Sequence, residues 1–354
     1  MKLEKIKPNC GRLNNNFYNP TILDNLDLSI VIPAYNVSNY IDACITSILS
    51  QVTKYKYNII IINDGSQDDT EQKLQKYKNR DNILIINQTN NGQAFARNRA
   101  LEYCDGKYLM FVDADDILLQ GTIEKLLNIA NGNDYDIIEG VIISFHNQEA
   151  ILDDAKKLTK KIRVFEYSKN PYHVLSSKGY SPGKIFKREL WNQIRYPEGY
   201  IFEDTIIKLV VRRYCKRCAF YDDYVYGYRY NVNSTTRSGN AIRALDALWV
   251  LPKVIEISKE LNISTDKIFY LLILNHLGIL MRNIVYNLDT IIQKYVLVIS
   301  SEIIKEYYLD NSRRLPFLFK LLEKSIITLN FDNWILVSDF LGRYNVLKKW
   351  RESN

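Results

Sequence analysis

Short apolar runs alternate with stretches of helical periodicity between residues 28 and 130. The apolar runs are rich in Ile, Val and Leu and stop at Pro, Gly or polar residues, a pattern typical of buried strands. They cover residues 28–32, 57–62, 83–86 and 108–112. Between them, apolar residues at helical spacing predict helices. These cover residues 41–49, 68–77, 93–103 and 122–130. The alternation predicts an α/β fold with a mostly parallel sheet and helices on both of its faces.

Polar or turn-forming residues come after each of the four predicted strands. They occur at residues 34–36, 63–65, 90–92 and 113–116. In a parallel sheet the carboxyl ends of the strands meet at one edge, and ligands bind outside that edge. The sequence therefore predicts a binding site built from these four loops.

Beyond residue 130 the pattern changes twice. Residues 135–145 and 219–230 are strand-like, and from residue 241 onward apolar residues recur at helical spacing. Residues 231–240 are rich in Asn, Ser and Thr, and this composition indicates a weakly marked boundary between the two regions. We therefore predict three parts, which are an N-terminal arm (1–26), an α/β domain (27–238) and a C-terminal helical region (239–354).

Composition and charge narrow the class of protein. Apolar residues make up 47% and charged residues 25% of the 354 residues, as in an ordinary globular protein. The net charge of +7 favours anionic partners such as nucleotides, or serves solubility alone, and both interpretations stay open. The chain has no nucleic-acid-binding motif, and its first residues lack the apolar run of a signal peptide.

Two further features bear on the compartment. Cys215 and Cys218 have no second Cys or His pair to complete a zinc site, so we expect reduced thiols in a cytosolic protein. The most apolar stretch, residues 269–281, is interrupted by Asn275 and His276. It is shorter than the ~18 residues that cross a bilayer, so no transmembrane helix is expected.

Three carboxylates stand in the four positions Asp113-Ala114-Asp115-Asp116, directly after a predicted strand. Their mutual repulsion is tolerable on a solvated turn, or where a cation such as Mg²⁺ or Mn²⁺ shares carboxylate oxygens with substrate phosphates. Spacing alone leaves both interpretations open. Phosphatases that form an aspartyl-phosphate also carry Asp-x-Asp after a strand, but their motif stands after the first strand, and here it stands after the fourth.

Four sequence motifs occur in a fixed order along the predicted α/β domain. They are residues 29–36 (SIVIPAYN), 63–66 (NDGS), 91–98 (NGQAFARN) and 111–116 (FVDADD). The series closely resembles family-2 inverting glycosyltransferases of the GT-A fold, of the type that builds bacterial surface polysaccharides. The resemblance is strong over residues 28–125 and looser to residue 235. It implies a Rossmann-like GT-A domain, with a helical region C-terminal to it, that binds a nucleotide-sugar.

The resemblance assigns donor-binding roles to the first two motifs. Pro33, Ala34 and Tyr35 are expected to line the nucleotide base and ribose, with the Tyr35 ring stacked on uracil. Asp64 is expected to accept the uracil imide N–H. The family usually has two aspartates before the Gly-Ser, and here the first is Asn63, so Asp64 carries that role alone. A simple turn former is the alternative for Asp64.

The last two motifs imply contacts to the diphosphate and the metal. Arg97 is expected to face the base or the diphosphate, or to pack against Asp64. By the resemblance Asp113 contacts ribose or sugar and shares the metal, while Asp115 coordinates the Mn²⁺ or Mg²⁺ that bridges the diphosphate. Asp116 either binds sugar hydroxyls or caps the next segment of the chain.

A catalytic base is expected in the second half of the chain. Residues 200–205 (YIFEDT) resemble the acidic pair that the family places at the start of a helix near the acceptor. By this match Asp204 is the base that removes the acceptor proton, and Glu203 tunes or positions it. Acidic residues that only favour the helix dipole are the alternative. Lys184 is either a loop cation near phosphate or a surface lysine, and Arg237 either pairs with the diphosphate or is a linker residue.

The resemblance predicts a metal-dependent inverting glycosyltransferase that moves a sugar from a nucleotide-sugar, with UDP as the expected nucleotide, to a glycan or a lipid-linked saccharide. One alternative is a non-catalytic nucleotide-sugar-binding or scaffolding subunit of a glycan-synthesis complex. Another is a metal-dependent phosphate-ester hydrolase that uses the Asp cluster. The expected location is cytoplasmic, with peripheral contact at the inner face of the cell membrane as an option.

The predicted helical region carries basic residues among apolar ones, including Lys320, Lys324 and residues 348–351. A basic amphipathic helix with aromatic residues can lie on an anionic membrane surface, which would suit an acceptor carried on a lipid. A subdomain that packs on the catalytic part and an interface between identical chains are the other interpretations.

Overall fold

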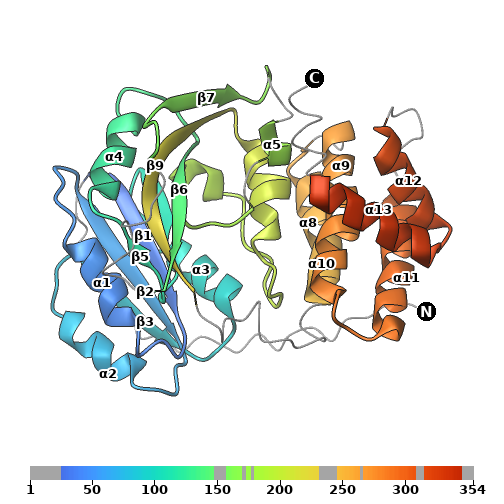
Figure 1. Cartoon of the computed structure of the whole chain (residues 1–354). Helices are drawn as coiled ribbons and strands as arrows, with labels where there is room; N and C mark the ends of the chain where they lie inside the picture. Colours follow the sequence, from blue (N-terminus) through green and yellow to red (C-terminus); the bar gives the residue numbers. More distant parts are fainter. Residues whose placement is uncertain are drawn as a thin grey trace. The chain divides into compact units, whose positions relative to one another are not determined.

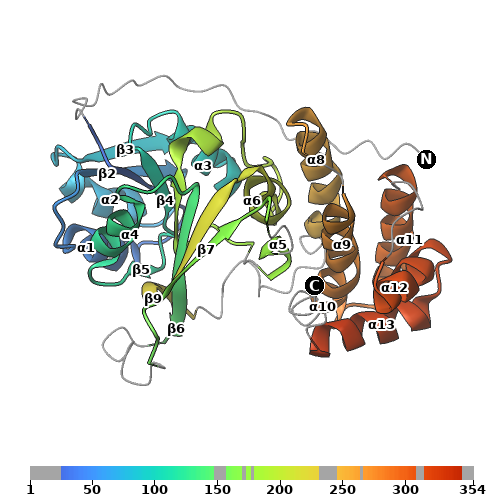
Figure 2. The same cartoon turned by 90° about the horizontal axis from the view of Figure 1, so that it is seen from above.

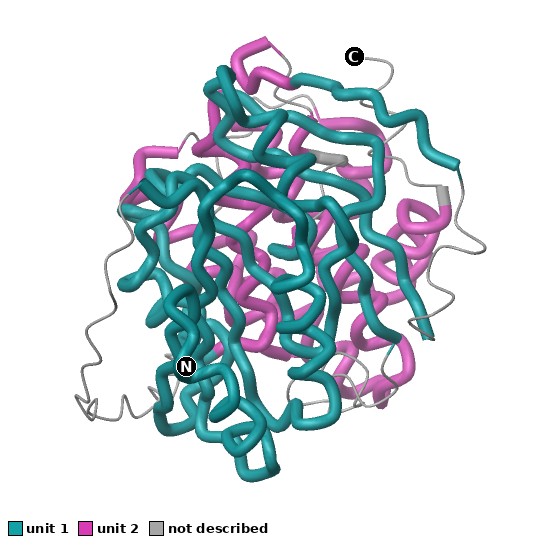
Figure 3. The backbone as a smooth tube through the Cα atoms, turned by 90° about the vertical axis from the view of Figure 1, so that its left-hand side faces the viewer, with its two compact units in different colours: residues 1–164, 181–199, 217–231 teal, residues 165–180, 200–216, 232–354 magenta. Residues whose placement is uncertain are grey.

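A computed structural model (Figure 1) describes residues 25–146, 157–169, 173–176, 179–230, 245–263, 266–307 and 315–344. The chain divides into two compact units (Figure 3). Unit 1 comprises residues 1–164, 181–199 and 217–231, and unit 2 comprises residues 165–180, 200–216 and 232–354. All but two residues of the predicted arm, and the predicted boundary after residue 238, lie outside the described residues, so these limits stay predictions.

In the described part of the chain, unit 1 is built on a mixed nine-stranded sheet (Figure 1). Its strands are β1 (Leu28–Ala34), β2 (Tyr57–Asp64), β3 (Ile83–Gln88), β4 (Tyr108–Phe111), β5 (Ile117–Leu118), β6 (Ile137–Phe145), β7 (Ile162–Glu166), β8 (Lys184–Lys187) and β9 (Arg217–Arg229). The strand order is β3-β2-β1-β4-β8-β6-β9-β5, and β7 pairs with β9 off this path.

The first four strands run parallel, as the sequence predicts. β1 pairs with β2 on one side and with β4 on the other, so that Leu28 lies beside Tyr57 and beside Tyr108. Every residue of β1 is buried, which is why this strand is a continuous apolar run without the alternation of a half-exposed strand. Gly106 allows the chain to pass close to β1, because a Cβ there would lie 2.4 Å from the backbone nitrogen of Ser29.

Helices cover both faces of this sheet. Alternate side chains of a strand point to opposite faces. Ile30 and Ile32 of β1 belong to one apolar cluster with side chains of α1 (Ile41–Leu49), α2 (Thr70–Leu74) and α4 (Thr122–Ala130), which Figure 2 shows together. Val31 and Phe111 therefore point to the other face, where α3 (Gln93–Leu101) contacts β1 and β2. On that face Phe111 packs edge-on against Trp191 and Tyr196, with ring centroids 5.1 and 5.4 Å away.

The second half of the sheet is mixed. β8 is antiparallel to β4 and β6, β6 is parallel to β9, and β5 is antiparallel to β9. The strand-like segments predicted at residues 135–145 and 219–230 are confirmed as β6 and β9. Short 3₁₀ turns come after α2 and β8 as η1 (Gln75–Tyr77) and η2 (Arg188–Trp191).

The described part of unit 2 is helical, as predicted for the chain beyond residue 241. Its helices are α5 (His173–Ser176), η3 (Ile207–Val211), α6 (Arg212–Tyr214), α8 (Asp246–Glu260), α9 (Lys267–Asn275), η4 (His276–Leu280), α10 (Met281–Val285), α11 (Thr290–Tyr307), α12 (Phe317–Ile327) and α13 (Phe331–Tyr344). Residues 165–180 and 200–216 cluster with these helices, although their sequence predicts that they belong to the α/β domain.

One continuous helical run, Lys267–Val285, is longer than the sequence predicts. It has 19 residues and a mean hydropathy of 1.6, which by length and composition is enough to cross a membrane. Asn275 and His276 do not interrupt it. Burial lowers the pKa of His276 to about 4, and its Nε2 lies 2.5 Å from the carbonyl oxygen of Ala247. The expected length was therefore wrong, but 72% of the run is buried inside the protein.

Helices α12 and α13 are joined by residues 328–330 and both pack on this run; we call them the α12–α13 hairpin. Leu322 of α12 lies over Gly278, where a Cβ would approach it to 2.5 Å. The fully buried Trp334 of α13 donates from its indole N–H to the carbonyl oxygen of Leu277 at 3.4 Å. Gly278, in the middle of the run, thus allows α12 to pack closely against the run.

Gly278→Ala is expected to destabilise unit 2. The added methyl group would overlap Leu322, which is fully buried, and overpacking of this kind costs about 1–3 kcal/mol. Gly342→Ala in α13 is the matched control, since its Cβ would meet Ile279 at an ordinary 3.5 Å and alanine favours a helix over glycine. Urea unfolding monitored by circular dichroism should show a lower midpoint for the first variant alone. Equal midpoints would contradict the packing of α12 on η4.

Candidate functional site

The loops at the carboxyl ends of the four parallel strands are neighbours at one edge of unit 1. Ala34 at the end of β1 lies beside Asn63 of β2, and Asp64 lies beside Gln88 of β3. β4 lies on the other side of β1, so the acidic cluster directly after it belongs to the same edge. Residues spread over about eighty positions of sequence are therefore brought together by strand pairing.

Asp64 holds the turn after β3 in place. Its side chain is 3% exposed and its carboxylate accepts three hydrogen bonds. The donors are the side-chain amide of Gln88 at 2.8 Å and the backbone N–H groups of Asn91 at 2.9 Å and Gly92 at 2.8 Å. Gly92 has a φ of 92°, a conformation that favours glycine. A turn-forming role for Asp64 is thus present, and its contact with a nucleotide base stays a prediction.

The loop after β1 exposes Tyr35 and buries the two residues before it. Pro33 and Ala34 lie within buried β1, and Ala34 belongs to the apolar core. Tyr35 as a whole residue is 44% exposed. Asn36 has a φ of 51°, a left-handed conformation that asparagine tolerates better than most residues. Of the three residues expected to line a base, Tyr35 is the one that presents its side chain to solvent.

Reciprocal hydrogen bonds tie the Tyr35 loop to the loop after β2. The backbone N–H of Asn36 donates to Ser66 Oγ at 3.0 Å. In return, the backbone N–H of Gln67 donates to Asn36 Oδ1 at 2.8 Å. These bonds hold Asn36 in its left-handed conformation and so fix the direction of the neighbouring Tyr35.

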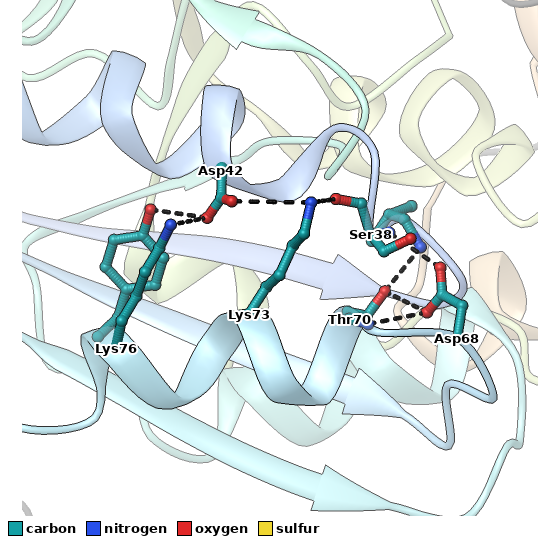
Figure 4. Close-up of polar contacts among 8 residues, drawn as sticks. Ser38, Asp42, Asp68, Thr70, Lys73 and Lys76 are labelled. Carbon is teal, nitrogen blue, oxygen red and sulfur yellow. Dashed lines mark hydrogen bonds and ion pairs between the residues drawn. The ribbon is translucent and has the colours of Figure 1, made fainter.

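Asp68 adds a second tie between the same loops (Figure 4). One carboxylate oxygen accepts the Ser38 N–H at 2.9 Å, and the other accepts the N–H of Thr70 at 3.0 Å. Thr70 Oγ1 in turn accepts the Val37 N–H at 2.9 Å. Burial raises the pKa of Asp68, but the hydrogen bonds from Thr70 and Ser38 outweigh it and lower the pKa to about 2. The Asp68 carboxylate that links the two loops therefore stays charged at neutral pH.

One lysine of α2 and one of η1 complete this arrangement on the side of α1. Lys76 Nζ lies 2.6 Å from Asp42 Oδ1, and Lys73 Nζ donates to the carbonyl oxygen of Ser38 at 2.7 Å (Figure 4). Lys73 of α2 and Lys76 of η1 are three residues apart, and together they hold both α1 and the loop before it. The loop that carries Tyr35 is thus ordered before any ligand arrives.

Arg97 and Asp113 form an ion pair next to this edge. Arg97, on α3, is 1% exposed, and its Nη2 lies 3.0 Å from Asp113 Oδ1. The side-chain amide of Gln93 donates to the same oxygen at 3.2 Å. The Arg97 guanidinium also stacks over the ring of Tyr196, 5.2 Å from its centroid. Arg97 is therefore oriented by Asp113 and Tyr196, and its contact with a base or diphosphate stays a prediction.

Asp116 anchors the acidic cluster to β9. It is 1% exposed, and its two carboxylate oxygens accept the Tyr226 hydroxyl at 2.8 Å and the Arg229 N–H at 2.7 Å. The backbone N–H of Asp113 donates to the same Tyr226 hydroxyl at 3.0 Å. Burial, with the nearby charges of Asp113 and Asp115, raises the pKa of Asp116 far above that of an ordinary aspartate. These partners give Asp116 a structural role that neither expectation named, and its contact with sugar hydroxyls stays a prediction.

Asp113 and Asp115 are the carboxylates that a cation could use. Burial raises the pKa of Asp115, although the charge of Arg229 opposes this. Its charged form is thus incompletely compensated by the protein, and a divalent cation would compensate it. Within the described residues, no group of three or more His, Cys, Asp or Glu is arranged to hold a metal. Two carboxylates fit Mg²⁺ or Mn²⁺, which commonly take one or two carboxylates and complete their shell with substrate phosphates and water.

Lys184 is neither of the two kinds of lysine that the sequence suggested. It lies in β8 with 0% of its side chain exposed. Its Nζ lies 3.6 Å from Glu139 Oε1 in β6 and donates to the carbonyl oxygen of Pro182 at 3.3 Å. Both expectations, a loop cation and a surface lysine, are wrong because strand pairing carries this residue into the sheet.

The acidic pair Glu203 and Asp204 belongs to unit 2. Helical residues begin at Thr205, and the carbonyl oxygens of Glu203 and Asp204 accept the N–H groups of Ile206 at 3.2 Å and Ile207 at 2.9 Å. Their predicted position at the start of a helix is confirmed. Glu203 is 3% exposed, and Asp204 is partly exposed. Arg237 lies outside the described residues, and the catalytic roles stay predictions.

Three residues near the acidic cluster have roles that the sequence did not predict. Tyr196 supports Arg97, Tyr226 links Asp113 and Asp116, and Arg229 donates from Nε to the carbonyl oxygen of Asp115 at 2.8 Å. All three lie about a hundred positions further along the chain. Nothing in a local pattern distinguishes Tyr226 from the other tyrosines of β9.

Asp64→Asn is expected to loosen the turn after β3. An asparagine keeps one oxygen acceptor and replaces the other with an NH₂ group, which cannot accept from the three N–H donors. A buried donor left without a partner costs about 1–3 kcal/mol. Hydrogen exchange should therefore speed up at Asn91 and Gly92. Asp69→Asn is the matched control, because Asp69 is exposed to solvent. Unchanged exchange at both amides in Asp64→Asn would contradict the assigned role.

Comparison with known proteins relates the sequence to a family. Residues 29–172 match the model of "Glycosyl transferase family 2". The chain is 31% identical over 222 residues to "Glycosyltransferase GlyA" of Streptococcus pneumoniae, and 28% identical over 245 residues to "Minor teichoic acid biosynthesis protein GgaB" of Bacillus subtilis. The alignments cover 59% and 67% of this chain, but 31% and 26% of those proteins. The chain thus spans less than a third of the length of either relative.

A solved structure has the same fold. The crystal structure of S. aureus TarS residues 1–349 in complex with UDP-GlcNAc matches with a TM-score of 0.68, over 90% of this chain and 92% of that chain, at 19% identity. At this identity the likeness concerns the fold alone. It confirms the predicted class, a GT-A-like mixed sheet with helices and a helical C-terminal region. Residues 29–172 are thus similar to the glycosyl transferase family 2 model, and the fold of the chain is similar to that of TarS.

Proposed function

We propose that this protein is a metal-dependent inverting glycosyltransferase that transfers a sugar from a UDP-sugar to a saccharide acceptor. One observation supports this above all. The loops of the family-2 domain that carry Tyr35, Asp64 and Asp113 lie on neighbouring parallel strands at one edge of the sheet. The carboxyl ends of parallel strands are where α/β sheets bind nucleotides.

The donor nucleotide binds at this edge in the proposal. Tyr35 offers an exposed aromatic face on which a uracil ring can stack. Asp64 uses three hydrogen bonds to hold its turn, and a carboxylate accepts about four. One acceptor position therefore suits the imide N–H of uracil. Pro33 and Ala34 line the nucleotide site with their backbone in this proposal. TarS, which shares the fold, was crystallised with UDP-GlcNAc, and this supports UDP as the nucleotide.

Asp113 and Asp115 would hold the Mn²⁺ or Mg²⁺ that the family resemblance implies. When bound, the cation would offset the negative charge that develops on the diphosphate as it leaves. Arg97 keeps Asp113 in place through their 3.0 Å ion pair and brings positive charge to the same edge. Arg237 is a second candidate for the diphosphate, and Asp116 contributes by holding the cluster against β9.

Transfer with inversion requires one displacement at the anomeric carbon. Asp204 takes the proton of the acceptor hydroxyl while the hydroxyl oxygen attacks from the face opposite the nucleoside diphosphate. The bond from the anomeric carbon to the diphosphate oxygen breaks as the glycosidic bond forms, and the nucleoside diphosphate leaves with the electron pair. Glu203, which is buried beside Asp204 in the chain, positions or tunes the base.

A glycan or a lipid-linked saccharide is the proposed acceptor, in the synthesis of a bacterial surface polysaccharide. The name of GgaB places that relative in teichoic acid biosynthesis, which supports a surface glycan. We propose a cytoplasmic location with peripheral contact at the inner face of the cell membrane. Association of identical chains through the helical region stays a prediction.

UDP with Mn²⁺ is expected to raise the melting temperature of the wild-type protein. A ligand that binds the folded state at about a hundred times its Kd adds about 2.7 kcal/mol of stability. Asp115→Ala should lose the part of the shift that depends on Mn²⁺. Asp105→Ala removes an exposed carboxylate and should respond as the wild type does. The measurement compares UDP, GDP and their sugars, with and without metal.

The possible results separate the alternatives. A shift with GDP alone would assign a different nucleotide. The absence of a shift with every nucleotide would contradict both the transferase and the non-catalytic nucleotide-sugar-binding subunit. Release of phosphate from simple esters without an acceptor, lost in Asp115→Ala, would favour the hydrolase.

Asp204→Asn is expected to bind UDP-sugars as the wild type does but to lose transfer. Removal of a general base typically slows a reaction by about 10²–10⁴-fold. Release of UDP from a panel of UDP-sugars, with glycan-bearing membranes as acceptor, measures the transfer. Asp105→Asn, which changes an exposed acid in the turn before β4, is the matched control. Retained transfer in Asp204→Asn would exclude Asp204 as the base, and binding without transfer in the wild type would favour the scaffolding subunit.

A further inference from the structure

Helix α12 exposes apolar and basic side chains on the same face. Phe317 and Leu321, one helical turn apart, are 73% and 37% exposed. Lys320 and Lys324 are exposed at the neighbouring positions of the same face. The opposite face is buried, with Phe319 and Leu322 fully covered. An exposed phenylalanine flanked by lysines differs from the polar outer face of an ordinary surface helix.

Helix α13 repeats this arrangement. Leu336 and Phe340 are 68% and 44% exposed and again lie one turn apart. Arg343 is exposed one turn further along, so the three residues have the spacing i, i+4, i+7 of a single helical face. Trp334 and Leu341, on the other face, are fully buried.

The exposed faces of the two helices point away from the same helical run. Leu322 of α12 packs on Gly278, and Trp334 of α13 contacts the carbonyl oxygen of Leu277. Both helices therefore turn their buried faces to Lys267–Val285, and residues 328–330 connect them directly. We call these two exposed faces the outer surface of the α12–α13 hairpin; Figures 1 and 2 draw the two helices in red.

Charges in the α12–α13 hairpin are sorted by sign. Glu323 accepts a hydrogen bond from the Tyr270 hydroxyl at 2.5 Å, and Asp339 pairs with Arg282 at 3.1 Å. Both acids thus face the run on which the hairpin packs. Lys320, Lys324 and Arg343 remain on the outer surface, where Asp332 is the exposed acid among the described residues of the two helices. The outer surface is therefore apolar and net positive.

We propose that the outer surface of the α12–α13 hairpin docks on an anionic phospholipid surface. Phe317 and Leu336 enter the boundary between headgroups and acyl chains, and the basic residues contact lipid phosphates. A second copy of this chain is a poorer partner, because a two-fold contact would set this positive surface against itself. The inference rests on the proposed peripheral membrane contact and names the surface that makes it, and it is independent of the transfer of sugar because docking needs neither donor nor acceptor.

Sedimentation of the full chain with phospholipid vesicles tests the proposal. Binding is expected to vesicles made of equal parts phosphatidylcholine and phosphatidylglycerol, and to be weak with phosphatidylcholine alone. In about 1 M salt the Debye length falls to about 3 Å, so binding should weaken strongly. Each basic residue near such a surface strengthens binding about fivefold, and Lys320→Gln and Lys324→Gln should each lose about that factor.

Apolar variants on two surfaces make the test specific. Phe317→Asp and Leu336→Asp should each weaken vesicle binding by at least about tenfold. Ile291→Asp is the matched control, because Ile291 on α11 is 78% exposed but lies outside the hairpin, and it should bind as the wild type does. Circular dichroism checks that each variant is folded, and all three sites are exposed enough to accept an aspartate.

Three results would overturn the proposal. Equal binding to neutral and anionic vesicles would exclude an anionic lipid surface. Wild-type binding by both Phe317→Asp and Leu336→Asp would place the contact elsewhere on the chain. Self-association of the wild type that Phe317→Asp abolishes, without binding to vesicles, would assign this surface to a second copy. UDP-dependent thermal shifts in the same variants show separately whether the donor site is intact, so the two proposals can fail independently.

Discussion

Three carboxylates stand within four residues directly after β4, and the fold has to place each one without leaving its charge uncompensated. It does so by giving each a different environment. Asp116 is buried against β9, where Tyr226 and the Arg229 N–H occupy both of its oxygens. Asp113 pairs with Arg97 from α3. The backbone carbonyl of Asp115 accepts a hydrogen bond from Arg229, and burial raises the pKa of its carboxyl. Because their partners hold Asp113 and Asp116 in place, Asp115 between them is fixed where a cation could compensate its charge. Helix α3 and strand β9 belong to the site because they supply those partners.

The same use of acids as acceptors orders the other two loops. Asp64 collects three N–H donors around Gly92, and Asp68 joins Ser38 to Thr70. The carboxylate of Asp64 is buried, so each bond that it lost would leave a donor without a partner. The edge of the sheet is therefore ordered before a ligand binds, and a ligand does not have to supply that ordering free energy. The left-handed Asn36 is maintained by this network and sets the direction of Tyr35.

The predictable part of the structure is the part that depends on local pattern. The apolar runs of β1, β2 and β4 are buried on both faces, so they stand out in the sequence, and their polar ends mark the edge. The burial of Lys184 was not predictable, because it arises from pairing of β8 with β6, which no local pattern reveals. The link from Tyr226 to Asp113 spans 113 positions and was equally hidden. The run Lys267–Val285 exceeded its expected length because a buried contact to Ala247 accommodates His276 within the helix.

Some charged residues in the described part of this chain face a residue of opposite charge, and others face solvent. We expect the first kind to stabilise the fold and the second kind to be available for binding. Lys184 faces Glu139 within the sheet, and Arg282 faces Asp339 beneath the hairpin. In such a pair each charge offsets the desolvation cost of the other, so no further ligand is needed to compensate them. Lys320 and Lys324 instead stand in solvent beside a largely exposed Phe317. Exposure of that ring is unfavourable in water, and a surface that covers it while supplying negative charge removes both costs at once. An anionic lipid surface would cover Phe317 and supply negative charge to the lysines of the hairpin. In the same way, a bound cation would supply positive charge to Asp115.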